Sequence, residues 1–154
     1  MGVEQISAIV VDVAFQIHRE IGPGLLETVY EAVLAKRLRD RGLRVARQVS
    51  VPIQIDGIVL DEGFRADLLV EDSFVVELKS VEALAPVHPK QVRTYLRLLG
   101  LPVGLVINFG GALFKDGVRR VVNDHRDTSG SRLRINGGAG EESGSCEGAR
   151  ARSN

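Results

Sequence analysis

The spacing of apolar residues changes from a helical period to strict alternation, and this change constrains the fold more than any other feature of the chain. From Ile6 to Ile17, apolar residues recur every three or four positions, which predicts an amphipathic helix. This helix should end near Ile21, because Gly22-Pro23-Gly24 stops it. A second apolar stripe predicts another helix directly afterwards, and its members are Leu25, Val29, Val33, Leu34 and Leu38.

From Val45 onward, apolar and polar residues alternate, which is typical of strands that bury one face. Asp56-Gly57 predicts a hairpin turn after the first strand. The second strand should run from Ile58 to Val70, with a bend or bulge around Glu62-Gly63, and the third from Phe74 to Leu78. These segments predict an antiparallel unit in the middle of the chain.

A helix and further strands follow this unit. The helix should begin within residues 86–89 and end at Gly100, and the apolar run from Val103 to Asn108 predicts a buried strand. A last hairpin is expected from Ala112 to Val122, with Asp116-Gly117 as its turn. The order of elements predicts an α/β fold with a central mixed, largely antiparallel sheet flanked by helices.

Composition indicates a single domain. The chain has 154 residues, 44% of them hydrophobic, which suits one sizeable core. We expect the domain to occupy residues 1–124, because residues 125–154 are rich in Gly, Ser, Arg and Glu and predict a disordered polar tail. Lys and Arg together number 20, as do Asp and Glu, so the net charge of zero gives no overall attraction to nucleic acid or to an anionic membrane.

Several classes of protein are disfavoured by what the sequence lacks. The single cysteine, Cys146, excludes a disulfide framework and a Cys-rich zinc site, which favours the reducing cytoplasm. No apolar run reaches the roughly 20 residues that a membrane helix needs, so we expect no membrane association. Neither a phosphate-binding Walker loop nor a dinucleotide fingerprint occurs, so nucleotide hydrolysis and redox chemistry have no support.

The segment from Phe64 to Ser80 holds the residues that could carry chemistry. If its turn is centred on Asp72, antiparallel pairing puts Asp67 opposite Glu77, and alternation puts Lys79 on the same face as Glu77. Two facing carboxylates destabilise a sheet unless something offsets their charge. Mg²⁺ prefers oxygen ligands and is commonly held by one or two carboxylates plus phosphate oxygens. The pattern therefore offers the ligands of a magnesium site, in which the lysine would stabilise negative charge on phosphorus.

On spacing alone, a structural salt bridge on a strand is the favoured interpretation, and two further features bear on the choice. Glu27 and Glu31 stand one turn apart on the second helix, and either could reach a metal site. An acid in the first turn of a helix is also favoured by the helix dipole without any function. Gln91 and Tyr95 share a face of the later helix, where a neutral amide could position a water or a phosphate.

In this order, these residues resemble the GxxExxY protein family, a branch of the PD-(D/E)XK nuclease-like superfamily. The resemblance covers roughly residues 6–122 and depends on three motifs: Gly24-x-x-Glu27-x-x-Tyr30, Asp67 with Glu77-Leu78-Lys79, and Gln91 with Tyr95. It implies a restriction-endonuclease-like fold and metal-dependent cleavage of phosphodiester bonds. Ala66 replaces the proline of the superfamily motif and Phe64 replaces an expected tyrosine, but neither change removes a ligand.

The resemblance also implies roles for residues that match the motifs. The implied metal ligands are Asp67, Glu77 and the backbone carbonyl of Leu78. Lys79 would be the catalytic lysine, Glu27 the early helical acid that completes the metal site, and Gln91 the polar residue on the helix after the core hairpin. The implied cofactor is Mg²⁺, with Mn²⁺ as the alternative ion.

Two functions remain open from the sequence. One is an Mg²⁺-dependent nuclease that hydrolyses DNA or RNA by metal-activated water. The other is a non-catalytic module that binds nucleic acid or protein with a nuclease-like fold, which the zero net charge favours. Aromatic residues make up only 5% of the chain and offer little stacking surface for single strands, so duplex or structured nucleic acid is the expected partner. By analogy with the superfamily, an exposed sheet edge could allow a homodimer.

Overall fold

The computed structural model describes residues 1–123, and residues 124–154 lie outside the described part. Within it, the helices are α1 (Val3–Ile21), α2 (Glu27–Asp40) and α3 (Val87–Leu99). The strands are β1 (Val45–Ile55), β2 (Ile58–Val70), β3 (Phe74–Lys79), β4 (Val103–Asn108) and β5 (Val118–Val122), and the short 3₁₀ helix η1 (Phe114–Gly117) precedes β5. The predicted polar tail falls outside the described residues, so its boundary stays a prediction.

The strands form one sheet in the order β1-β2-β3-β4-β5. β3 and β4 pair in parallel, with α3 between them in the chain, and the other neighbouring strands pair antiparallel. The sheet is therefore mixed and largely antiparallel, and with its flanking helices it gives the restriction-endonuclease-like α/β fold that the sequence predicts.

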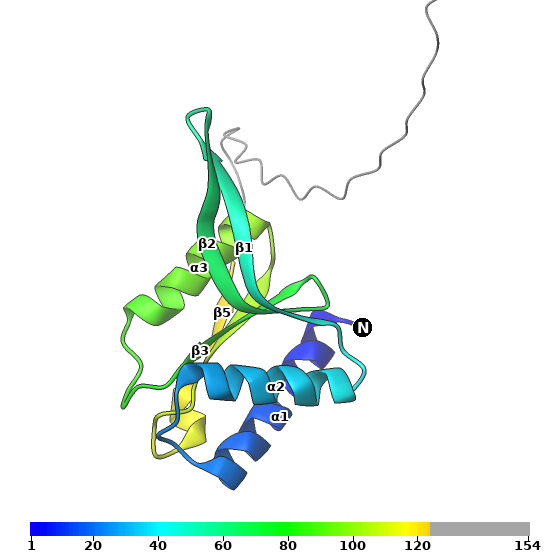
Figure 1. Ribbon diagram of the computed structural model, residues 1–154, viewed down its shortest axis with the longest axis vertical. Coiled ribbons are helices and arrows are strands. Elements are labelled where there is room, and N and C mark those ends of the chain that lie inside the picture. Colours follow the sequence, from blue (N-terminus) through cyan, green and yellow to red (C-terminus); the bar gives the residue numbers. More distant parts are fainter. Residues whose placement is uncertain (124–154) are drawn as a thin grey trace, which may run out of the picture.

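The helices cover opposite faces of the sheet, so the interior has two parts. On one face, Leu34 and Leu38 of α2 belong with α1 to a core that includes Leu78 of β3. On the other face, Val92 and Leu96 of α3 pack in a second core with strand residues. Figure 1 shows α1 and α2 together at one end of the molecule and α3 beside the long β1–β2 hairpin. Neighbouring residues of β3 and β4 are buried on both faces, which explains their continuous apolar sequence.

The β1–β2 hairpin contains the bulge that the sequence predicts near Glu62-Gly63. The pairing register changes between Val51 and Ile53, opposite this part of β2. A Cβ atom at Gly63 would lie 2.0 Å from Cγ1 of Ile53, so a residue without a side chain is required at the bulge. Beyond the bulge the hairpin extends away from the rest of the sheet (Figure 1).

One local prediction is wrong and another holds only in part, since Leu34 and Leu38 are buried as predicted but the first residues of the stripe are not. Leu25 precedes α2, and it is exposed together with Val29, whereas the helix buries Tyr30, Glu31, Leu34, Ala35 and Leu38. The apolar stripe misled because Tyr30 stacks on Phe109 and because the buried acid Glu31 has polar partners on β1. The expected hairpin over residues 112–122 does not form, since η1 occupies its first half and β5 pairs with β4 instead.

Within residues 1–123, no helix combines the length and the hydropathy that a membrane-spanning segment needs.

Candidate active site

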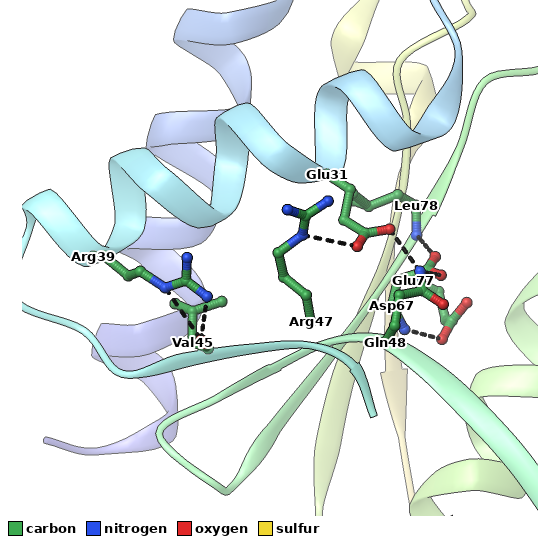
Figure 2. A network of polar contacts seen from close by, with 8 residues as sticks. All are labelled: Glu31, Arg39, Val45, Arg47, Gln48, Asp67, Glu77 and Leu78. Atoms are coloured by element: carbon green, nitrogen blue, oxygen red, sulfur yellow. Dashed lines mark hydrogen bonds and ion pairs between the residues drawn. The ribbon is translucent and has the colours of Figure 1, made fainter. Parts of the chain in front are cut away.

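Asp67 and Glu77 interlock where β2 and β3 separate. The two strands pair regularly from Val70 with Phe74 to Leu68 with Val76, which is the register predicted from a turn centred on Asp72. At the next position, side chains take over from the backbone ladder. The backbone N–H of Asp67 donates to Oε1 of Glu77 at 3.1 Å, and the N–H of Leu78 donates to Oδ2 of Asp67 at 2.8 Å (Figure 2). Both carboxylates are therefore held in place by main-chain donors of the opposite strand.

This arrangement disfavours a negative charge on Glu77. The side chain is buried, and burial together with the nearby charge of Asp67 raises the pKa of Glu77 from 4.5 to about 8. Tyr95 of α3 is affected in turn: burial raises the pKa of its phenol, and the charges of Glu77 and Asp67 raise it further. Two ionised carboxylates, one buried and one half-buried, are thus electrostatically unfavourable here without a cation, and Tyr95 of α3 lies close enough for their charge to raise its pKa.

The acids of α2 approach this pair by two different routes. Oε1 of Glu27, at the first position of the helix, accepts a hydrogen bond from the N–H of Ser80 at 3.3 Å, next to Lys79. Glu31, one turn later, is buried and is connected to Asp67 through Gln48. From their spacing in the sequence, either of these two acids could reach a metal site. The structure thus brings Glu27 to the residues after β3 and Glu31 to the side of Asp67.

Lys79 and Gln91 are positioned less tightly than the carboxylates. Lys79 is the last residue of β3, is half-buried, and pairs in the parallel register with Asn108 of β4. Gln91 is exposed on α3 and, within residues 1–123, makes no hydrogen bond to the other candidate residues. Tyr95, one turn later on the same helix, stacks on Phe64 with 4.3 Å between ring centroids. The structure therefore places Gln91 on the helix that faces the acid pair but does not join it to that pair.

Sequence reasoning missed one residue at the centre of the site. The side-chain amide of Gln48 donates to Oε2 of Glu31 at 2.7 Å and to Oδ1 of Asp67 at 3.3 Å, and Nε of Arg47 donates to Oε1 of Glu31 at 3.1 Å (Figure 2). A glutamine on an edge strand has no sequence signal that would reveal this. Its position follows only from the pairing register of β1 with β2.

The donor set available to a metal ion is small. In the described part of the chain, no three His, Cys, Asp or Glu side chains lie close enough together to hold an ion by themselves. Asp67 and Glu77 are nevertheless adjacent, and carboxylate oxygens suit a hard divalent cation that completes its coordination with water and phosphate oxygens. The site can therefore supply two carboxylates but needs other oxygen atoms to fill the coordination sphere of an ion.

The fold and these side chains define a class of protein: a restriction-endonuclease-like α/β domain with an acid pair and a lysine on its central strands. Residues 4–121 match the family model of the PD-(D/E)XK nuclease superfamily, and the chain belongs to that superfamily. No curated protein and no solved structure matches the chain. Members of the superfamily typically use divalent metals, and nucleic acid is the substrate class that its name implies.

Proposed function

We propose that this protein is an Mg²⁺-dependent nuclease that hydrolyses phosphodiester bonds in DNA or RNA. The observation that carries the proposal is the interlocked pair of Asp67 and Glu77, in a chain of the PD-(D/E)XK nuclease superfamily. Two adjacent carboxylates, one of them with its pKa raised to about 8, are unfavourable unless a cation compensates them. A divalent ion would remove that penalty and is the cofactor that such ligands suit.

Each of the candidate site residues has a distinct part in the proposed reaction. Asp67 and Glu77 would bind the ion, with the Leu78 carbonyl as a further ligand, and the main-chain donors of the opposite strand fix both carboxylates beforehand. A bound divalent cation supplies Lewis-acid chemistry, which activates water and neutralises charge on the phosphate. Lys79 lies two residues after Glu77 on β3, where its ammonium would stabilise the negative charge that develops on phosphorus.

Glu27 and Gln91 would act at the edge of the site. Glu27 accepts a hydrogen bond from the N–H of Ser80, so its carboxylate is held at the residue that follows Lys79. Gln91 lies on the helix that carries Tyr95, and its amide, which makes no hydrogen bond within residues 1–123, would orient a phosphate or a water. These positions support the narrower assignment to the GxxExxY family, whose motif is Gly24-x-x-Glu27-x-x-Tyr30 in this chain.

Three narrower expectations accompany the proposal. Duplex or structured nucleic acid remains the expected substrate because few aromatic side chains are available for stacking. The cytoplasm remains the expected location because the chain has a single cysteine. A homodimer would use the open edge at β1, which is the first strand of the sheet.

The test separates metal binding from catalysis. Mg²⁺ and Mn²⁺ are titrated calorimetrically into the wild type, Asp67→Ala and Lys79→Ala, and the same samples are then incubated with DNA and with RNA. Asp67→Ala should lose both metal binding and cleavage because it removes a ligand. Lys79→Ala should keep the metal affinity while cleavage falls by about 10²-fold, since only transition-state stabilisation is lost.

A matched control is Asp61→Asn, which removes an exposed carboxylate from the same strand and should leave both measurements unchanged. Undiminished cleavage by purified Asp67→Ala would exclude the nuclease assignment at this site. Absence of metal binding by the wild type, even with nucleic acid present, would instead favour a non-catalytic binding module with a nuclease-like fold.

A further inference from the structure

Gln48 has a backbone conformation that a glutamine rarely adopts. Its φ is +49°, in the left-handed region that side chains other than glycine generally avoid. The residue lies inside β1 rather than in a turn, and the pairing of β1 with β2 is regular on both sides, with Arg47 opposite Leu68 and Val49 opposite Ala66. The pair that this register would form between them, Gln48 with Asp67, is missing from the ladder. Such outliers persist only where the surrounding structure enforces them, and they cluster at functional sites.

The interruption coincides with a change in the face that the hairpin presents. Leu68 and Val70 belong to the core under α1 and α2, whereas Phe64 and Ala66 belong to the core under α3. Alternate residues of a regular strand share one face, so β2 turns over at Asp67. On β1 the same change occurs between Val45 and Val49, on either side of Gln48. The unusual φ of Gln48 therefore belongs to the place where the hairpin passes from one core to the other.

The side chain of Gln48 uses this position to connect two acids. One amide nitrogen donates to Glu31 at 2.7 Å and to Asp67 at 3.3 Å. With Nε of Arg47 on the other oxygen, both carboxylate oxygens of Glu31 have partners, and that side chain is almost fully buried. Both oxygens of Asp67 are likewise occupied, one by Gln48 and one by the N–H of Leu78. Of the side-chain N–H donors in the described residues, only Gln48 donates a hydrogen bond to Asp67.

We infer that Gln48 is a positioning residue, which orients the carboxylate of Asp67 for metal binding by anchoring it to the buried Glu31. The inference depends on the proposed function, because it assigns Gln48 a role at the same metal site. A neutral amide suits this role, since it donates to both acids without neutralising the charge that would attract a cation. The strained backbone is explained as well, because a regular strand residue at this position would pair with Asp67 through its main chain instead.

The test compares Gln48→Ala with Gln48→Gly, because both variants lack the amide and only the second relieves the backbone. Mn²⁺ affinity is measured by calorimetry and stability by the thermal midpoint. Both variants should bind Mn²⁺ about tenfold or more weakly than the wild type, since removal of a group that orients a ligand typically costs that much affinity. Glycine adopts a positive φ without strain, so Gln48→Gly should nevertheless melt above Gln48→Ala. Gln54→Ala, an exposed glutamine of the same strand, should match the wild type in both measurements.

The outcomes distinguish this inference from the proposed function. If both Gln48 variants bind Mn²⁺ as tightly as the wild type while Asp67→Ala does not bind it, the positioning role is wrong and the metal site stands. A purely structural role would make affinity follow the melting temperature, with Gln48→Gly binding more tightly than Gln48→Ala, and this result would also overturn the inference. Equal Mn²⁺ affinity of the wild type and Asp67→Ala would overturn both.

Discussion

The pKa of Glu77 departs far from the ordinary value of a glutamate because of the residue's surroundings. In the folded chain its pKa is about 8, because burial and the charge of Asp67 disfavour the carboxylate, whereas an exposed glutamate titrates near 4.5. Between these pH values the folded state holds a proton that the unfolded state has released. Stability is therefore fully present below the unfolded pKa and is lost as the pH rises towards the folded pKa.

This linkage predicts how metal-free protein responds to pH. In the presence of a chelator, the free energy of unfolding should fall between about pH 5 and 8, by at most about 1.4 kcal/mol per pH unit from this group. Glu77→Gln should flatten the profile, because a neutral amide has no proton to release, whereas Glu82→Gln, an exposed control, should keep the slope. Urea unfolding at several pH values measures both. A wild-type profile with the same slope as that of Glu77→Gln would show that Glu77 is ionised in the folded state.

At the scale of single residues, the sequence predicted that Asp67 lies opposite Glu77, but it did not predict all of the hydrogen-bond partners of these two acids. The register of Asp67 with Glu77 followed from one short turn, which leaves little freedom in alignment. The partner on β1 could not be derived in this way. Counting back from the Asp56-Gly57 turn, as the pairs Ile55–Ile58 and Ile53–Leu60 do, would place Ala46 opposite Asp67, but the bulge shifts the register and brings Gln48 there instead. A bulge of unknown size therefore hid the central glutamine.

At the scale of elements, the segment after β3 depends on the end of β4. Asn108 is buried, and its side-chain oxygen accepts hydrogen bonds from the N–H groups of Val81 and Gly110, each at 3.0 Å. Its side-chain nitrogen donates to the carbonyl of Val81 at 2.9 Å. These bonds tie the end of the parallel strand pair to the chain that follows Lys79. The end of β4 thereby fixes the direction that the chain takes after Lys79, the last residue of β3.

Removal of this side chain should weaken the fold at that point. We expect Asn108→Ala to lower the free energy of unfolding by about 2–3 kcal/mol, because it leaves three backbone groups without their partner in a partly buried position. Gln54→Ala, which removes an exposed amide, should change the stability little. Chemical denaturation gives both values. A cost as small as that of the control would mean that water replaces the Asn108 amide at these groups.

Elements with a strong local signal were predicted well, and those that depend on tertiary contacts were not. The glycine-terminated helices and the Asp56-Gly57 hairpin are encoded by neighbouring residues, and all of them form. The segment before β5 carries the same Asp-Gly signal in Asp116-Gly117, yet it forms η1. Phe114 of this segment is buried beside Phe15 and His18 of α1, and that contact between distant parts of the chain decides its conformation.

At the scale of the whole molecule, the candidate site lies where the two hydrophobic cores meet. One core unites α1 and α2 with the sheet, the other unites α3 with the opposite face, and the hairpin passes from one to the other at Gln48 and Asp67. The candidate site thus receives residues from α2, three strands and, through the proximity of Tyr95, α3. The assembly of the site therefore requires both halves of the interior, which no single motif in the sequence could reveal.

The extent of the folding unit can be tested at this scale. Within residues 1–123, both cores are built from residues up to Val121, the last described strand ends at Val122, and the family match ends at residue 121. A chain ending at residue 124 should therefore keep the thermal midpoint and the Mn²⁺ affinity of the full chain, because it retains every contact of the cores and of the candidate site that the described residues make. Calorimetry of the two proteins side by side measures both quantities.

A chain ending at residue 117 is the matched control. It lacks β5, leaves an edge of β4 unpaired and removes Val121 from the core under α3, so it should not give a cooperative transition. A marked loss of stability in the chain ending at residue 124 would contradict the predicted domain boundary and would place part of the folding unit in residues 125–154.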